Sequence, residues 1–211
     1  MSIKIECKDI ILREFIESDL DAFHALTWQP SIYEFLPGWN VSKEQRKDWL
    51  LHYEIPDNKR FLDAVSIGGD IGELRLRMGI ILQENNEFIG WCCTGIKEEL
   101  PPPNREIMYA VSPDYRGKDY ATQAVIGLAK YLFQNTNTEM LKAVVLLENV
   151  PAAEHEANPY ESYPHQDEQS NQKESNANKN QKIGKHHAIQ GGLEQYTPSF
   201  WLVSDENIVV D

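Results

Sequence analysis

The sequence predicts a mixed α/β fold, in which short strands and amphipathic helices follow one another along the chain. Short apolar segments rich in β-branched residues are typical of strands, and Lys142–Leu147 is a compact example. Other segments repeat apolar residues at three- and four-residue steps, as a helix requires, and Tyr120–Gln134 shows this pattern best. With 211 residues, the chain is long enough to bury a core without disulfides or a structural metal.

The N-terminal part is predicted to form one strand and then two helices. Ile3–Glu14 alternates apolar and polar residues, which favours a strand. Ser18 is expected to cap the first helix, because two acidic residues follow it where the helix dipole is positive. Ser42 is expected to cap the second helix, with Gln45 three residues later as in a capping box.

The middle of the chain is predicted to form four strands and one long helix. Glu84–Asn86 is a short polar turn between two strand-like segments and indicates a hairpin. Leu100–Pro103 is expected to be an extended loop, because proline supplies no N–H donor for a strand ladder. The expected strands are Arg77–Gln83, Glu87–Ile96, Arg105–Val111 and Lys142–Leu147, and the helix is Tyr120–Gln134.

The composition changes abruptly after the last of these strands. Pro151–Lys182 contains no Val, Ile, Leu, Met, Phe or Trp, so it cannot bury enough apolar surface to offset the entropy of ordering. We interpret residues 152–174 as a polar insertion, flexible or lid-like, within a single domain that spans residues 1–211. Tyr196–Val203 and Ile208–Val210 are expected to form the final strands.

The charge balance excludes one class of function and favours another. The chain has 33 acidic and 20 basic side chains, a net charge of −13. Such a protein is unsuited to nucleic acid, whose phosphates are bound mainly by Lys and Arg, and it attracts cationic amines. Its apolar runs are too short to span a membrane, and Cys7, Cys92 and Cys93 are expected to be free thiols in a reducing compartment. We therefore expect a cytoplasmic protein.

One short loop carries a local excess of positive charge. Arg116 and Lys118 flank Gly117, just before the long helix predicted to begin at Tyr120. A helix N-terminus offers free backbone N–H groups and the positive end of the helix dipole, so this loop could bind a phosphorylated ligand. The alternative is a solvated turn capped by Asp119.

The same region resembles a known family. Val111–Ala124, which reads VSPDYRGKDYATQA, resembles the acetyl-CoA signature of the GNAT-superfamily N-acetyltransferases, and it is most similar to the ribosomal-protein N-terminal acetyltransferase branch. Further matches to that branch are Ile11–Phe15, Ser18–Leu20, Phe88–Trp91, Glu106–Tyr109 and Val144–Asn149. The resemblance implies a central, mostly antiparallel twisted sheet with helices on both faces, and an acetyl-CoA-dependent N-acetyltransferase.

The resemblance also implies roles for individual residues. Glu106 would be the general base. The alternative is that Glu106 is an ordinary carboxylate at a strand end. The backbone of residues 109–111 would pair with the pantetheine arm, and the amides of residues 116–121 would hold the pyrophosphate. Phe35–Trp39 would border the acceptor site. The implied cofactor-binding residues are Tyr109, Ala110, Val111, Arg116, Gly117, Lys118, Asp119, Tyr120, Ala121, Thr122 and Asn149.

The chain departs from the family pattern at two places. Asp119 stands where the family usually has glycine, and its carboxylate would compete for the helix amides and repel phosphate. The helix that normally follows Asn149 is matched only by the polar segment Ser175–Lys185. The tyrosine that often acts as general acid has no clear counterpart, and Tyr160, Tyr163 and Tyr196 cannot be assigned to it.

The sequence thus predicts transfer of an acetyl group from acetyl-CoA to a primary amine. The acceptor is left open between a protein N-terminus and a small amine such as a polyamine or an aminoglycoside. The alternative is a weakened or non-catalytic GNAT-fold binding or regulatory protein. We expect no metal, since the adjacent His186 and His187 lack a third ligand, and a monomer or homodimer without nucleic-acid or membrane partners.

Overall fold

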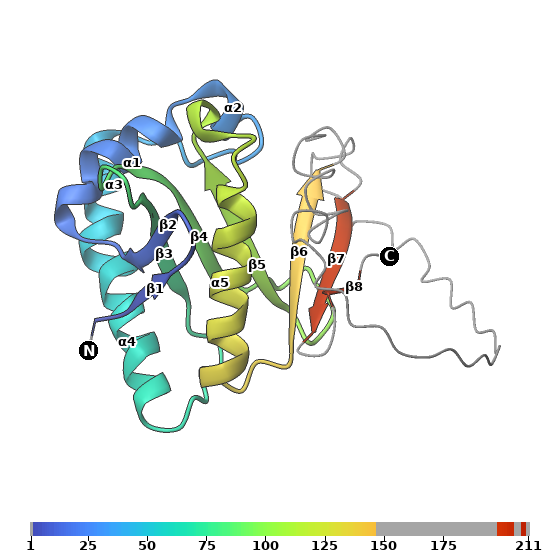
Figure 1. Ribbon diagram of the computed structural model, residues 1–211. Helices are drawn as coiled ribbons and strands as arrows, with labels where there is room; N and C mark the ends of the chain where they lie inside the picture. Colours follow the sequence, from blue (N-terminus) through green and yellow to red (C-terminus); the bar gives the residue numbers. More distant parts are fainter. Residues whose placement is uncertain (1, 147–197, 205–207, 210–211) are drawn as a thin grey trace.

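The computed structural model describes residues 2–146, 198–204 and 208–209 and contains one eight-stranded sheet (Figure 1). The strands lie side by side in chain order, and every neighbouring pair is antiparallel except β5 and β6, which are parallel. The strands are β1 (Lys4–Glu6), β2 (Ile10–Glu14), β3 (Leu76–Leu82), β4 (Phe88–Ile96), β5 (Arg105–Val111), β6 (Met140–Leu146), β7 (Pro198–Ser204) and β8 (Ile208–Val209).

Helices cover both faces of this sheet, as the sequence predicted. The helices are α1 (Leu20–Thr27), α2 (Pro30–Tyr33), α3 (Lys43–Trp49), α4 (Ile55–Ser66) and α5 (Tyr120–Asn135). On one face, α5 buries Leu128 and Leu132 against Leu12 of β2 and Ile107 of β5. On the other face, Phe23 of α1 packs with Trp91 and Cys93 of β4 and Ala110 of β5. The prediction of a mixed, mostly antiparallel α/β fold is confirmed.

The N-terminal prediction was wrong in detail. Ile3–Glu14 forms two strands rather than one, because the chain turns back where Cys7 N–H donates to the Ile10 carbonyl at 3.0 Å. Gln123 of α5 accepts from the Asp9 amide at 2.9 Å and so holds this turn. The alternating pattern fits one strand or two, and only the contact with α5 decides between them.

Ser18 does not cap the first helix. It lies inside a 3₁₀ turn, Glu17–Asp19, that leads directly into α1. Asp19 stabilises this entry instead: its side chain accepts from the Ile16 amide at 2.9 Å and forms an ion pair with Arg13 at 2.6 Å. Arg13 belongs to β2, so the start of the helix is fixed by a neighbouring strand.

The segment from Lys43 to Ser66 is one continuous helix with a π-helical turn at Leu50–Glu54 between α3 and α4. The predicted cap is confirmed, since Ser42 Oγ accepts from the Gln45 amide at 3.2 Å. Pro56 explains the irregular turn, because its ring nitrogen has no N–H for the usual helical bond. The sequence analysis did not predict α2 or α4.

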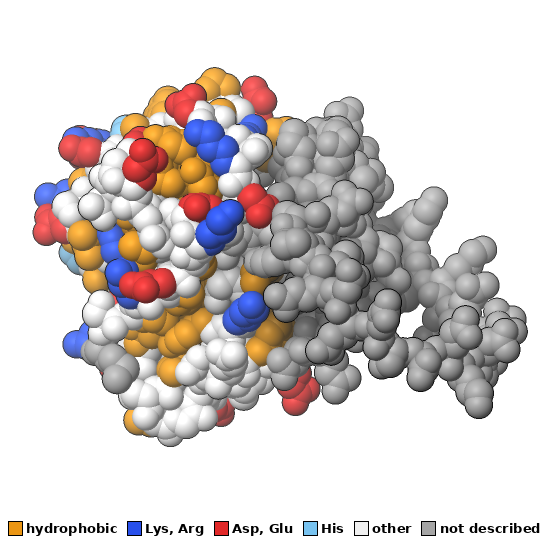
Figure 2. Space-filling model, viewed as in Figure 1, with side chains coloured by type: hydrophobic (Ala, Val, Ile, Leu, Met, Phe, Trp, Pro, Cys, Tyr) orange, Lys and Arg blue, Asp and Glu red, His pale blue; other side chains and the backbone are white. Residues whose placement is uncertain are grey.

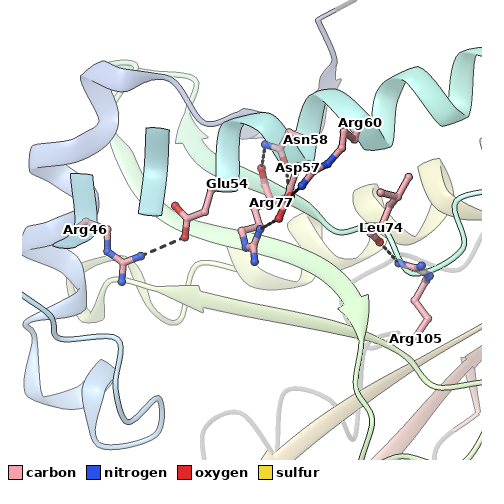
Figure 3. A network of polar contacts seen from close by, with 8 residues as sticks. All are labelled: Arg46, Glu54, Asp57, Asn58, Arg60, Leu74, Arg77 and Arg105. Carbon is pink, nitrogen blue, oxygen red and sulfur yellow. Dashed lines mark hydrogen bonds and ion pairs between the residues drawn. The ribbon is translucent and has the colours of Figure 1, made fainter. Parts of the chain in front are cut away.

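Arg46 is the centre of the helical layer. Its side chain is 0% exposed, and its guanidinium lies 4.5 Å from the ring centre of Phe23 and 5.1 Å from that of Trp49. It donates to Glu54 at 3.3 Å, as Figure 3 shows, and to the Trp39 carbonyl at 2.9 Å. Burial lowers the pKa of Arg46 and raises that of Glu54 despite their proximity. Arg46 therefore joins three aromatic residues of separate segments.

Cys92 and Cys93 are buried free thiols and Cys7 is a half-buried one, as expected. Trp28 is a large apolar side chain that stays 49% exposed. No helix among the described residues is both long and apolar enough to cross a membrane. The described residues also contain no group of three or more His, Cys, Asp or Glu side chains that could hold a metal ion.

Replacement of Arg46 by alanine is expected to lower the free energy of unfolding by about 3 kcal/mol or more, because it leaves Glu54 buried without its partner. Urea denaturation of the full chain measures this change. Arg60→Ala is the matched control: Arg60 is exposed and pairs with Asp57 on the same helix, and such pairs contribute less than about 1 kcal/mol. Equal losses in the two variants would contradict the central role of Arg46.

Candidate active site

The site lies where the two parallel strands part. β5 and β6 share a single register pair, Glu106 with Lys142, and Figure 1 shows the strands diverging beyond it. On its other side β5 pairs with β4 along its whole length, from Arg105 to Val111. Within the described residues, no ladder bonds the β6-facing edge of β5 past Glu106. This open edge can accept hydrogen bonds from, and donate them to, an extended ligand.

The open end of β5 is held closely against β4. A Cβ atom at Gly90 would lie 2.2 Å from the carbonyl oxygen of Ala110, so only glycine allows the two strands to approach this far. The Ser112 amide then donates to the Ile89 carbonyl at 2.8 Å and extends the contact beyond the strand end. The predicted pantetheine-contacting segment, residues 109–111, is therefore rigidly positioned.

A short loop connects β5 to the N-terminus of α5. It contains a 3₁₀ turn, Pro113–Tyr115, and two left-handed residues, Gly117 at φ 70° and Asp119 at φ 63°. The first helical backbone bond that begins here is Gln123 N–H to the Asp119 carbonyl, at 3.0 Å. Within the described part of the chain, the amides of residues 117–121 have no hydrogen-bond acceptor. These donors, with the helix dipole behind them, fit an anionic group such as a pyrophosphate.

Asp119 has the left-handed backbone that its place in the loop requires, but its side chain does not cap the helix. Its backbone adopts the left-handed conformation that glycine would adopt without strain. Its side chain makes no capping hydrogen bond, so the alternative of a turn capped by Asp119 is wrong. The exposed carboxylate does not occupy the helix amides, but it adds negative charge beside them. Over this end of α5, Figure 2 shows acidic and basic side chains close together.

The two basic residues of the loop are partly engaged elsewhere. Arg116 donates from Nη2 to the Ser31 carbonyl of α2 at 3.0 Å, and Lys118 Nζ lies 5.4 Å from the ring centre of Tyr115. The Gln29 amide reaches Ser112 Oγ at 3.5 Å, so the segment around α2 supports the loop at two points. Arg116 still has four of its five N–H donors for a ligand.

Glu106 lies in an open pocket of about 440 Å³ on the other face of the sheet from α5. Side chains alternate along a strand, so Glu106 points to the same face as Met108 and Ala110, whereas Ile107 and Val111 pack under α5. The pocket is lined by Trp39, Arg75, Arg77, Cys93, Thr94, Gly95, Ile96, Lys97, Glu98, Glu99, Glu106 and Met108.

The surroundings of Glu106 make its carboxylate a stronger base than an exposed glutamate. Burial raises the pKa of the Glu106 carboxyl above its ordinary value, the nearby Lys97 lowers it, and Glu99 raises it further. A higher pKa makes the carboxylate a stronger proton acceptor than an exposed glutamate would be. Glu106 is therefore suited to remove a proton from an amine that enters the pocket.

The structure brings most of the sequence-predicted residues into one region. Residues 109–111 and 116–122 follow one another from the open end of β5 into α5, and Glu106 begins the same strand. Trp39, expected to border the acceptor site, lines the pocket of Glu106 and stacks on Trp91 with ring centres 5.1 Å apart. Asn149, the insertion at residues 152–174, the segment Ser175–Lys185, His186 and His187, and Tyr160, Tyr163 and Tyr196 lie outside the described residues.

The sequence analysis missed the basic residues of the pocket. Arg75 and Arg77 stand two positions apart at the start of β3, and both line the pocket with Glu106. Their signal in the sequence is an alternation of arginine with Leu74, Leu76 and Met78, which places both arginines on one face of a strand.

Comparison with known proteins assigns the chain to a family. The family model of the acetyltransferase (GNAT) domain matches residues 9–154. A GNAT-family acetyltransferase from Bacillus anthracis is 16% identical, with a TM-score of 0.65 over 97% of this chain and 100% of its own. None of the curated proteins matches the chain.

Two ligand-bound structures have the same fold. RimL, a ribosomal L7/L12 α-N-protein acetyltransferase in complex with coenzyme A, is 17% identical, with a TM-score of 0.56 over 75% of this chain and 83% of its own. AAC(6')-Ib in complex with paromomycin and acetyl-CoA is 18% identical, with a TM-score of 0.53 over 70% of this chain and 79% of its own. Given the family match and this shared fold, the chain belongs to the GNAT family of acetyltransferases, enzymes that take their acetyl group from acetyl-CoA.

Proposed function

We propose that this protein transfers the acetyl group of acetyl-CoA to a primary amine, with Glu106 as the general base. The observation that carries the proposal is the position of Glu106 in a pocket on one face of β5, while the other end of the same strand leads to the amides of residues 117–121, which have no acceptor among the described residues. One strand thus connects an acceptor pocket with a donor site. Acetyl-CoA supplies the acetyl group as a thioester, which an amine can attack without a metal.

The donor site would hold acetyl-CoA through its backbone. The amides of residues 117–121 would face the pyrophosphate, and the backbone of residues 109–111 would pair with the pantetheine arm as another strand does. Arg116 is tied to Ser31 through one donor and has others to offer a phosphate oxygen. Asn149 is proposed to hydrogen-bond the cofactor, as the family resemblance implies.

The acceptor side carries out the proton transfer. An amine enters as its ammonium form, and Glu106 removes one proton directly or through a water molecule. The freed nitrogen forms a bond to the thioester carbonyl carbon, the C–S bond breaks, and its electron pair leaves on the coenzyme A sulfur. The nitrogen then gives up its second proton, which the departing thiolate takes up, so that the products are the N-acetylated amine and coenzyme A. Backbone donors near Val111 stabilise the oxyanion that forms on the carbonyl oxygen. The acceptor amine is either a protein N-terminus or a small amine.

Relatives of known fold act on both kinds of acceptor. RimL is described as an α-N-protein acetyltransferase, and AAC(6')-Ib has been crystallised with the aminoglycosides paromomycin and ribostamycin. Titration calorimetry with acetyl-CoA, followed by thiol release on a panel of amines, tests the proposal. Binding followed by turnover is expected. Failure to bind at millimolar acetyl-CoA would favour the alternative, a non-catalytic binding protein that Asp119 has weakened.

Replacement of Glu106 by glutamine is expected to lower kcat by about 10²-fold or more while the Kd for acetyl-CoA stays unchanged, because the amide cannot accept the ammonium proton. In the wild-type enzyme, kcat/KM should fall as the pH drops through the raised pKa of Glu106, since the protonated carboxyl is no base. This limb of the pH profile should be absent from the variant.

The control for that variant is Glu17→Gln, which removes an exposed carboxylate from a turn far from the pocket. Its rate and pH profile should match those of the wild type. If Glu106→Gln keeps the wild-type kcat and its acidic limb, another group is the base.

Replacement of Asp119 by glycine is expected to tighten acetyl-CoA binding about two- to fivefold, the effect of one charge at a helix terminus. Asp119→Asn should give most of this gain, because asparagine tolerates the left-handed conformation but carries no charge. The gain should shrink at high salt. Asp114→Asn, on the same loop, is the control and should leave the Kd unchanged. Unchanged binding in both Asp119 variants would show that the carboxylate does not oppose the phosphates.

A further inference from the structure

Two rows of side chains cross the pocket on the face that carries Glu106. In the first row, Gly95 of β4 pairs with Glu106 of β5, and Arg75 lies on the far side of Gly95, where its Cγ is 3.0 Å from the place of a Cβ at that glycine. In the second row, Arg77 of β3 pairs with Cys93, and Cys93 pairs with Met108. Each row therefore has an arginine at one end and a small residue in the middle.

The small residues leave a shallow trough, and the side chain of Arg75 extends into it over Gly95, where its Nε lies 3.5 Å from the place of a Cβ. Neighbouring strands are about 4.8 Å apart, so the backbones of Arg75 and Glu106 are separated by two such spacings, about 10 Å. Both side chains line the same pocket from opposite sides. A small molecule in this trough would meet a carboxylate at one end and guanidinium groups at the other.

The two arginines have donors to spare. Within the described part of the chain, the guanidinium of Arg75 has no hydrogen bond or ion pair. Arg77 is held by Asp57 of α4 through Nη1, at 3.2 Å, as Figure 3 shows. Its side chain is only 17% exposed, and the remaining N–H groups of its guanidinium have no acceptor among the described residues. An anionic group on a ligand would provide the acceptors that these donors lack.

The acidic residues of the pocket do not cancel this positive end. Glu98 and Glu99 line the pocket but are exposed to solvent, and Glu99 is within 4.0 Å of Lys97. Neither comes within ion-pair distance of Arg75 or Arg77. Asp57 offsets the charge of Arg77, with which it is paired at 3.2 Å, so the positive charge at this end of the trough is that of Arg75, for which the described residues offer no carboxylate within ion-pair distance. A second ammonium group would be repelled there.

We propose that the preferred acceptor is an amine that also carries a carboxylate, with its ammonium group at Glu106 and its carboxylate at Arg75 and Arg77. This inference rests on the proposed function, because it assigns the acceptor of the same reaction. A free amino acid has this chemistry, and so does a peptide with an acidic residue next to its N-terminus. Polyamines and aminoglycosides do not have it.

The experiment combines a change in the enzyme with a change in the substrate. Thiol release is measured for amino acids and their amides, for short peptides with Asp or Lys at the second position, and for spermidine and an aminoglycoside. The full chain is tested as wild type, Arg75→Gln, Arg75→Lys and Lys59→Gln. Lys59 is exposed on α4 outside the pocket, so its variant controls for the loss of one positive charge.

The wild type is expected to use the best carboxylate-bearing acceptor at least tenfold more efficiently, in kcat/KM, than the same molecule with its carboxylate amidated. Arg75→Gln should raise the KM of the carboxylate form at least about tenfold and leave kcat and the amide unaffected. Arg75→Lys should restore part of this selectivity, and Lys59→Gln should behave as wild type. Comparison of free amino acids with peptides that have Asp at the second position shows which of the two the pocket accepts.

The inference is overturned if amides, spermidine or an aminoglycoside are acetylated as well as the carboxylate-bearing amines. It is also overturned if Arg75→Gln slows every acceptor equally, which would be a structural effect. Both outcomes leave acetyl transfer to an amine intact. If no amine of any kind is acetylated, the proposed function itself fails, and the inference fails with it.

Discussion

The single register pair between β5 and β6 is the constraint on which the site depends. Every other pair of neighbouring strands is antiparallel, but the chain crosses over through α5 before β6, so these two strands run in the same direction. They meet at Glu106 and Lys142 and then separate. If they stayed paired to the end of β5, the backbone N–H and C=O groups along this edge of β5 would all be bonded to β6. Because they separate, the strand keeps donors and acceptors for a ligand.

This arrangement lets one strand serve two substrates. The backbone edge of β5 faces the gap in the ladder, while Glu106 projects to the face covered by α1 and its neighbours. The loop after Val111 then directs the chain into α5, and the amides of residues 117–121 have no acceptor among the described residues. Under the proposed function, donor and acceptor would meet β5 from different sides, which is the geometry that direct transfer between them needs.

One wall of the proposed acceptor pocket is held in place by a buried charge, that of Arg46. Trp39 lines the pocket and stacks on Trp91, and Arg46 holds it by a hydrogen bond to its carbonyl. Arg46 also binds Glu54 at the end of the π-helical turn that Pro56 imposes. A buried ion pair of this kind contributes less to stability than to the unique orientation of the parts it joins, which we infer to be its role here.

The sequence by itself determined the elements whose signals are local. The strand Arg105–Val111, the cap at Ser42 and the start of α5 at Tyr120 follow from hydrophobic period, capping chemistry and a glycine-containing loop, and the structure has them at those residues. The signature around Arg116 likewise identified the family. These features need only neighbours along the chain, so a reader of the sequence has all the necessary information.

Only the tertiary structure decided what depends on distant partners. The hairpin of β1 and β2 is held by Gln123, the start of α1 by Arg13, and the side chain of Arg116 by Ser31. Asp119 could have been a cap or a strained turn residue, and its backbone conformation made it the latter. Arg75 became a neighbour of Glu106 only through the register of three strands. The local pattern of apolar and polar residues determines which helices and strands form. The chemistry of the pocket depends instead on side chains that are far apart in the sequence and that the sheet brings together.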